Sequence, residues 1–209
     1  MPFLGLPIEQ APRAVIFDIG RVIIRVEMSR SVAMLGQRKE LSNLQLLREL
    51  ESDSRWPDWQ EGRMAPREWH AHLAGKFQFS HTFEEFCAIW NSVLDPDTIL
   101  PEQLFERLAA KCRLALLSNT DPIHVAHFEA TFPFVRHFPA RVYSCRAGAS
   151  KPSPAIFHRV LRELNALPEE AMFIDDIHEN AAAAARLGIN AFHFTSAEEL
   201  IAELSRLGL

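Results

Sequence analysis

Acidic and small polar side chains follow apolar runs at three separate places in this sequence. Asp18 comes directly after one run, Ser118-Asn119 after a second and Asp175-Asp176 after a third. Carboxylates can bind a cation or act as a nucleophile or base, and hydroxyl and amide groups can donate hydrogen bonds to a charged ligand. One such residue has an ordinary explanation as a helix N-cap, but the whole set is hard to explain in that way. The set therefore predicts a reactive site.

Apolar runs of strand length must position these residues, and helical patterns separate the runs. The runs are 13–17, 114–117, 141–143, 171–174 and 189–194, with amphipathic stretches at 101–112, 154–165 and 180–187. Gly188 follows the last of these stretches, where a helix C-cap glycine belongs. Apolar strands that alternate with helices are typical of a parallel sheet covered on both faces. We therefore expect an α/β fold with a doubly wound parallel sheet, whose strands share one ligand-binding edge at their carboxyl ends.

The stretch from about residue 28 to residue 95 differs from the rest of the chain. It shows no convincing strand, only helical patterns at 41–50, 66–77 and 83–90. Because it follows the first strand directly, we expect it to form a small helical domain over the carboxyl edge of the sheet. The same stretch contains all four tryptophans, Trp56, Trp59, Trp69 and Trp90. Most of them are expected in the core of this insert, with one lining a substrate pocket as the alternative.

Composition and charge exclude several classes of protein. The chain has 209 residues and a formal net charge of −5, which argues against a nucleic-acid binder. No apolar run approaches the roughly 20 residues that a membrane span needs, and residues 1–13 do not resemble a secretory signal. The three cysteines show no metal-type spacing, so reduced thiols in a cytoplasmic protein are the simplest expectation.

Four segments, in this order and at these separations, resemble the four motifs of the haloacid dehalogenase (HAD) superfamily. They are FDIGRVI at 17–23, LLSNT at 116–120, the segment from Ser144 through Lys151-Pro152 to Phe157, and FIDD at 173–176 with Asn180 and Gly188. Each motif is weak alone, but together they cover residues 13–194. The resemblance is greatest to phosphatases that act on glucose 1-phosphate and to the amino-terminal phosphatase domain of soluble epoxide hydrolases. It implies a Rossmann-like core at 1–27 and 96–209 with a C1-type cap at 28–95.

The resemblance also implies a Mg²⁺-dependent phosphatase that forms an aspartyl-phosphate on its nucleophile, Asp18. Asp18, the Gly20 carbonyl and Asp176 would hold the metal ion, and Asp175 would orient water or Lys151. A cation is needed because a carboxylate and a phosphoryl group repel each other. The substrate would be a small phosphorylated metabolite.

The same resemblance implies which residues would contact the phosphoryl group: two neutral donors and one cation. The Ser118 hydroxyl and the Asn119 amide would contact phosphoryl oxygens, where positioned donors stabilise developing charge. Lys151 would place a positive charge near the nucleophile and the phosphate.

The sequence departs from the family pattern after the nucleophile, where Gly20 replaces the usual acid/base aspartate. General acid–base catalysis is commonly worth about 10²–10⁴-fold in rate. The substrate could have a good leaving group, His178 or an acid from the cap could replace the aspartate, or the protein could be a weakened enzyme. Arg21 is also unusual, and could contact phosphate or substrate or pair with an acid at the surface.

Three other functions compete with the phosphatase. A 2-haloacid dehalogenase uses the same aspartate on carbon without Mg²⁺, but it has no use for the Asp175-Asp176 pair. A binding or regulatory module could keep the fold with weakened chemistry. A response-regulator receiver also uses Asp, Lys and Mg²⁺, but it would lack the helical insert. The sequence leaves the physiological substrate and the oligomeric state open.

Overall fold

A six-stranded sheet forms the centre of the molecule in the computed structural model, which describes residues 3–4, 11–35 and 42–209. The strands lie in the order β1-β8-β7-β2-β5-β6. They are β1 (Phe3–Leu4), β2 (Ala14–Phe17), β5 (Arg113–Ser118), β6 (Ala140–Tyr143), β7 (Ala171–Asp175) and β8 (Asn190–His193). All neighbouring strands are parallel except β1, which pairs antiparallel with β8. The predicted doubly wound α/β fold is confirmed.

Helices cover both faces of this sheet because the central strands are apolar on both sides. In β2, Val15 and Phe17 belong to one core cluster, and Ala14 and Ile16 belong to another on the opposite face. The first cluster packs against α6 (Glu102–Ala109), α7 (Pro122–Thr131) and α11 (Ala197–Arg206), and the second against α9 (Pro154–Leu164) and α10 (His178–Arg186). Shorter elements complete the core: η1 (Pro133–His137), α8 (Ser144–Ala147) and η2 (Pro168–Glu170).

The register of the central strands brings the predicted polar residues to one edge. Phe17 of β2 lies beside Leu116 of β5 and beside Ile174 of β7. Asp18 and Asp175 therefore lie at the same level, and Ser118 ends β5 one residue beyond that level. The Asp18 amide donates to the carbonyl of Ile174 at 2.9 Å.

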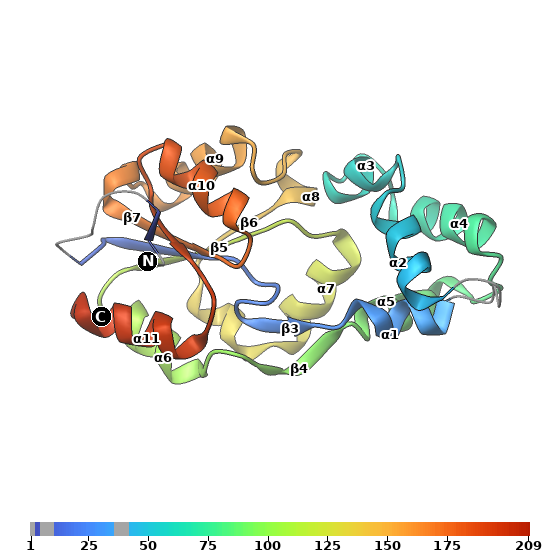
Figure 1. Ribbon diagram of the computed structural model, residues 1–209, viewed down its shortest axis with the longest axis horizontal. Coiled ribbons are helices and arrows are strands. Elements are labelled where there is room, and N and C mark those ends of the chain that lie inside the picture. The colour runs from blue at the N-terminus through green and yellow to red at the C-terminus, as the bar shows by residue number, and fades with distance from the viewer. Residues whose placement is uncertain (1–2, 5–10, 36–41) are drawn as a thin grey trace.

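The five helices between β3 (Ile24–Val26) and β4 (Leu94–Thr98) gather at one end of the molecule, beyond the sheet (Figure 1). They are α1 (Met28–Leu35), α2 (Asn43–Glu51), α3 (Trp56–Gln60), α4 (Pro66–Phe77) and α5 (Phe83–Asn91). Helices at the predicted positions are present as α2, α4 and α5, although Leu41 lies outside the described residues. Trp59, Trp69 and Trp90 are buried in a separate apolar cluster of this insert, and Trp56 packs against it.

A two-stranded antiparallel ribbon connects the insert to the core, and the sequence patterns did not predict it. Its strands are β3 (Ile24–Val26) and β4 (Leu94–Thr98), so the predicted boundary at residue 95 falls inside a strand. The sequence of β4, LDPDT, contains a proline and two aspartates, which pattern analysis excludes from strands. A two-stranded ribbon tolerates these residues because each strand has a free edge, where a missing N–H costs nothing.

Smaller differences from the predictions concern helix ends and helices without a clear pattern. The helix expected at 180–187 begins two residues earlier, and the sequence patterns did not predict α1, α3, α7, α8 or α11. Among the described residues, no helix combines the length and the apolar character that a membrane crossing requires.

Candidate active site

Lys151 joins two of the predicted carboxylates into one buried cluster. Its Nζ donates to Asp18 Oδ1 and to Asp175 Oδ2, both at 2.7 Å, and to the carbonyl of Leu117 at 3.0 Å. All three side-chain donors of the ammonium group are thereby used. Asp18 follows β2, Asp175 ends β7 and Lys151 follows α8, so residues far apart in the sequence meet at the carboxyl edge of the sheet.

Asp175 is saturated by hydrogen bonds within the protein. Besides Lys151, its carboxylate accepts from the backbone amide of Ile177 at 2.7 Å and from Asn180 Nδ2 at 3.2 Å. Its side chain is completely buried. Asp175 is therefore arranged to hold Lys151 in place and to fix the start of α10.

Asp176 has a different environment, although it is the next residue. Arg21 Nε donates to Asp176 Oδ2 at 2.6 Å, whereas Oδ1 is buried and has no hydrogen-bond partner among the described residues. Side-chain oxygens of Asp18, Asp175 and Asp176 lie within 4.8 Å of one another, a spacing that suits a shared metal ion. An unpaired buried carboxylate oxygen is costly, and a cation would satisfy it.

Ser118 and Asn119 both lie at this edge, but their side chains differ in availability. The Ser118 side chain is buried and has no hydrogen bond within the described part of the chain. The Asn119 side chain donates to the carbonyl of Lys151 and accepts from its amide, both at 2.8 Å. Asn119 therefore holds the Lys151 backbone with its oxygen and with one of its two side-chain N–H groups, so the predicted contact with phosphate would fall to the second N–H.

The electrostatics of the cluster follow from its burial. Burial raises the pKa of Asp18 to about 6, and the charge of Asp175 acts in the same direction, while Lys151 opposes them. Burial also disfavours the charged form of Lys151, but the two carboxylates outweigh it and raise the pKa of Lys151 above its ordinary value. The ammonium group therefore stays protonated between the acids.

The turn after the nucleophile sets the positions of Gly20 and Arg21. The Arg21 amide donates to the carbonyl of Ile24 at 2.7 Å, and Arg21 has a left-handed backbone with φ of 58°. No described residue donates a hydrogen bond to the Gly20 carbonyl. His178, considered above as a replacement acid, is exposed at the start of α10, and its ring contacts that of His193.

A buried contact between α5 and α7 joins the insert to the core, and sequence analysis did not anticipate it. Trp90 Nε1 donates to Asp121 Oδ2 at 2.9 Å, and His124 Nδ1 lies 3.0 Å from the same oxygen. His124 Nε2 lies 3.0 Å from the carbonyl of Trp90. Burial disfavours both charges, yet their attraction lowers the pKa of Asp121 and raises that of His124. The Asp-Pro pair at the start of α7 signals only a helix cap, so the sequence could not reveal this contact.

A second contact joins the end of α3 to α8, which lie side by side in Figure 1. The Ser144 hydroxyl lies 2.6 Å from the carbonyl of Gln60 and accepts a hydrogen bond from the Thr120 amide at 2.9 Å. Gly62 has φ of 70°, and a Cβ there would lie 2.0 Å from the carbonyl oxygen of Cys145. These two contacts between insert and core thus reach Thr120 and Asp121, in the loop that follows Ser118.

Gly62→Ala should therefore disturb the docking of the insert on the core. The added methyl group would require a shift of backbone at Cys145, and alanine at a positive φ costs roughly 1–2 kcal/mol in addition. We expect the free energy of unfolding to fall by at least about 2 kcal/mol in urea titrations. Gly75→Ala is the matched control, because a Cβ there meets no atom within 4 Å. Equal stability of the two variants would contradict the prediction.

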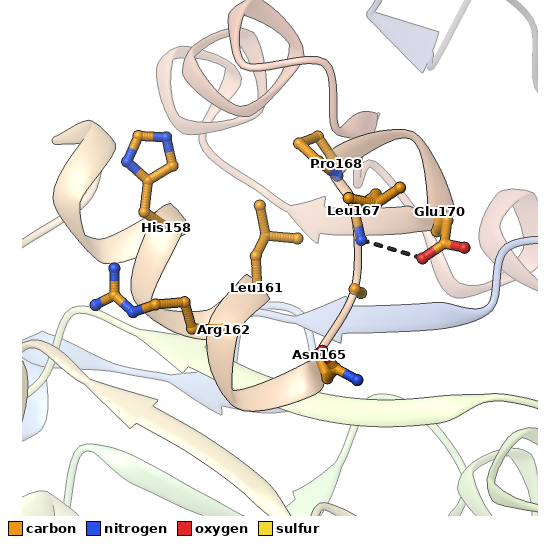
Figure 2. Close-up of a pocket in the computed structure, with 8 residues that line it drawn as sticks. His158, Leu161, Arg162, Asn165, Leu167, Pro168 and Glu170 are labelled. Atoms are coloured by element: carbon orange, nitrogen blue, oxygen red, sulfur yellow. Dashed lines mark hydrogen bonds between the residues drawn. The ribbon is translucent and has the colours of Figure 1, made fainter.

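A surface hollow elsewhere on the core is separate from this cluster. It has a volume of about 560 Å³ and lies between α9 and the segment at 165–170, where Glu170 accepts from the Leu167 amide (Figure 2). His158 and Arg162 line it, and none of the carboxylates around Lys151 does.

Comparison with known proteins agrees with the geometry of the cluster. The family model of haloacid dehalogenase-like hydrolases matches residues 12–188. The chain is 27% identical to acyl-CoA dehydrogenase family member 10 of Mus musculus over 93% of its own length, but it spans only 19% of that protein. It is 22% identical to a D-ribitol-5-phosphate phosphatase of Bacteroides thetaiotaomicron, covering 85% of this chain and 89% of that enzyme.

The structure is also similar to solved structures of this family. A HAD family enzyme of Bacteroides thetaiotaomicron, in complex with magnesium and inorganic phosphate, superimposes with a TM-score of 0.77 and 25% identity. The match covers 89% of this chain and 96% of that one. The family match extends over most of the chain and includes Asp18, Lys151 and the Asp175-Asp176 pair. The chain therefore belongs to the haloacid dehalogenase-like hydrolases and is an enzyme of that family.

Proposed function

We propose that this hydrolase is a Mg²⁺-dependent phosphatase that acts on a small phosphorylated metabolite through an aspartyl-phosphate on Asp18. The observation that carries the proposal is the cluster of Asp18, Asp175 and Asp176, in which Asp18 accepts from Lys151 and Asp176 Oδ1 has no hydrogen-bond partner among the described residues. The phosphatase and the magnesium–phosphate complex among the similar proteins support it.

The residues at the site fit a magnesium ion. Mg²⁺ prefers an octahedral shell of oxygen atoms and usually retains several waters. Asp18, Asp176 and the free Gly20 carbonyl would provide protein oxygens, whereas the oxygens of Asp175 are occupied by Lys151, Ile177 and Asn180. When bound, the ion would supply the positive charge that lets a carboxylate approach a phosphoryl group.

The protein groups then account for the remaining steps. An oxygen of Asp18 attacks phosphorus, the bond from phosphorus to the leaving oxygen breaks, and water later hydrolyses the acyl phosphate to restore Asp18. Lys151 keeps the nucleophile oriented and offers positive charge to the phosphoryl oxygens. The Ser118 hydroxyl, which has no partner among the described residues, is the neutral donor, and Asn119 fixes the backbone of Lys151.

We propose that the helical insert, residues 28–95, is the cap that determines the non-phosphate part of the substrate. The two contacts with the core described above, at Trp90 and at Gln60, both reach the loop that follows Ser118 at the end of β5. A substrate held beneath the insert would therefore lie next to the proposed phosphate site.

The experiment that tests the function is a screen of sugar phosphates, nucleotides and acyl phosphates with and without Mg²⁺. We expect release of inorganic phosphate only with the metal ion. Conversion of a 2-haloacid in excess chelator would favour the dehalogenase, and a protein that turns over no phosphate ester would favour the binding module.

Asp176→Ala should remove most of the affinity for Mg²⁺, because it deletes the buried unpaired oxygen. We expect the Mg²⁺ concentration for half-maximal activity to rise by more than about 100-fold, and chelator to silence the parent enzyme. Asp97→Ala, at an exposed residue of β4, is the control. Full activity of the parent in excess chelator would refute the metal assignment.

The rate should depend steeply on the pKa of the leaving group, because Gly20 cannot donate a proton. Phosphates with acidic leaving groups, such as p-nitrophenyl or anomeric sugar phosphates, should react faster than simple alkyl phosphates by about 10²-fold or more. Gly20→Asp should reduce the difference in rate between these substrates, because it supplies a proton donor. The side chain can be accommodated there, since a Cβ at this position lies 3.4 Å from Val26 and meets no closer atom. A flat dependence in the parent would show that another proton donor exists, and His178 would be the first residue to replace.

A further inference from the structure

The two oxygens of the Asp176 carboxylate have opposite environments. Oδ2 receives the Arg21 Nε hydrogen bond at 2.6 Å, and Oδ1 is buried without a partner among the described residues. The backbone of Asp176 is held too, because its carbonyl lies 3.0 Å from His193 Nε2. The carboxylate is therefore fixed at one oxygen and at its backbone, with the other oxygen available.

Arg21 reaches Asp176 from an unfavourable backbone conformation. Its φ of 58° lies in the left-handed region, which costs Arg more than it costs Gly or Asn. Strained residues of this kind persist at functional sites where other contacts over-determine them. Here the contacts are the bond from the Arg21 amide to Ile24 and the ion pair with Asp176.

We propose that Arg21 is a positioning residue for the metal site, which holds Asp176 so that Oδ1 faces the magnesium ion. This inference rests on the proposed metal site, and it follows the second of the two alternatives for Arg21, pairing with an acid, instead of contact with phosphate or substrate. Groups that bind the second atom of a metal ligand orient that ligand, and their loss typically weakens metal binding by about 10–100-fold.

The charge of Arg21 works against the metal ion, but weakly. The Arg21 side chain is 59% exposed, whereas that of Asp176 is 17% exposed, so solvent screens the guanidinium more than the carboxylate. Screening by solvent weakens the repulsion between Arg21 and the ion, so we expect the orientation of Asp176 to decide the effect and removal of Arg21 to weaken Mg²⁺ binding.

The test is calorimetric titration of the full chain with Mg²⁺, compared between the parent and Arg21→Asn. Asparagine tolerates the left-handed conformation but is too short to reach Asp176, so it removes the ion pair without backbone strain. We expect Mg²⁺ to bind about 10–100-fold more weakly, while the melting temperature in chelator stays equal or rises. Unchanged or tighter Mg²⁺ binding by Arg21→Asn would overturn the inference.

Three further variants separate orientation from charge and from general effects. Arg21→Lys keeps the charge without the planar guanidinium, and we expect it to bind Mg²⁺ as weakly as Arg21→Asn does. An affinity equal to that of the parent would overturn the inference.

In an Asp176→Asn background, Arg21→Asn should not lower the affinity for Mg²⁺ any further. A full additional loss of affinity would show that Arg21 acts elsewhere and would overturn the inference. Arg13→Ala breaks a comparable exposed ion pair with Glu170 at 2.8 Å and should not change the affinity.

The parent protein distinguishes the two proposals. Binding of Mg²⁺ by the parent together with equal binding by Arg21→Asn overturns the role of Arg21 alone. A parent that binds no Mg²⁺ overturns the proposed metal site and, with it, this inference.

Discussion

A chain with Asp18→Asn is expected to lose turnover by at least about 10³-fold and to remain folded. The amide lacks the nucleophilic charge and is a poorer metal ligand than the carboxylate. It retains an oxygen at the position of Oδ1, so Lys151 keeps an acceptor in place of the present 2.7 Å contact. The buried cluster therefore loses its chemistry and keeps its hydrogen bonds.

Steady-state rates with p-nitrophenyl phosphate and Mg²⁺ provide the measurement, and acid quenching provides a second one. The parent should show a phosphorylated protein that hydroxylamine cleaves, as expected of an acyl phosphate, and Asp18→Asn should not. Asp97→Asn, at an exposed position in β4, is the matched control. Residual activity of Asp18→Asn within tenfold of the parent would refute the nucleophile assignment.

Lys151→Met should destabilise the fold by about 3–5 kcal/mol near pH 7.5 and also abolish turnover. Methionine preserves most of the volume, but it leaves Asp18 and Asp175 as neighbouring buried carboxylates without a cation. Loss of one partner from a buried ion pair is costly because the remaining charge is uncompensated. The effect on stability should be seen by urea unfolding in chelator, where no metal ion can replace the ammonium group.

The destabilisation should shrink as the pH falls, and its sign follows from the pKa of Asp18. That pKa is already raised by burial to about 6 in the presence of Lys151, and removal of the cation raises it further. A carboxyl group with a raised pKa binds more protons in the folded state, so the free energy of unfolding falls as pH rises from about 4 to above 6. The cost of Lys151→Met near pH 5 should therefore be well below the cost near pH 7.5.

Lys111→Met is the matched control for this pH series. Lys111 is exposed, and its Nζ donates to the carbonyl of Gly208 near the carboxyl terminus. Its replacement should change the free energy of unfolding by less than about 0.5 kcal/mol at either pH. A cost for Lys151→Met that is the same at both pH values would contradict the electrostatic explanation.

The sequence by itself determined the parallel strands of the sheet, about half of the helices and the residues that meet at the carboxyl edge of the sheet. Runs such as 114–117 and 171–174 are apolar at every position, and such strands are typical of a sheet covered on both faces. The apolar pattern is visible in the sequence without any structure. Asp18, Ser118 and Asp175-Asp176 could be assigned to one edge because parallel strands present their carboxyl ends together. The family resemblance, now confirmed, added Lys151 to this set.

Only the tertiary structure decided which atoms of these residues are free. Lys151 and Asn180 donate to the oxygens of Asp175, and Arg21 donates to only one oxygen of Asp176. The packing of distant segments determines which of these donors reach the two carboxylates. The same is true of the Asn119 amide and of the contact between Trp90 and Asp121. Sequence patterns report local periodicity and burial, whereas a hydrogen bond depends on distances of a few tenths of an ångström between distant segments. For that reason residue types could be predicted for this protein, and their partners could not.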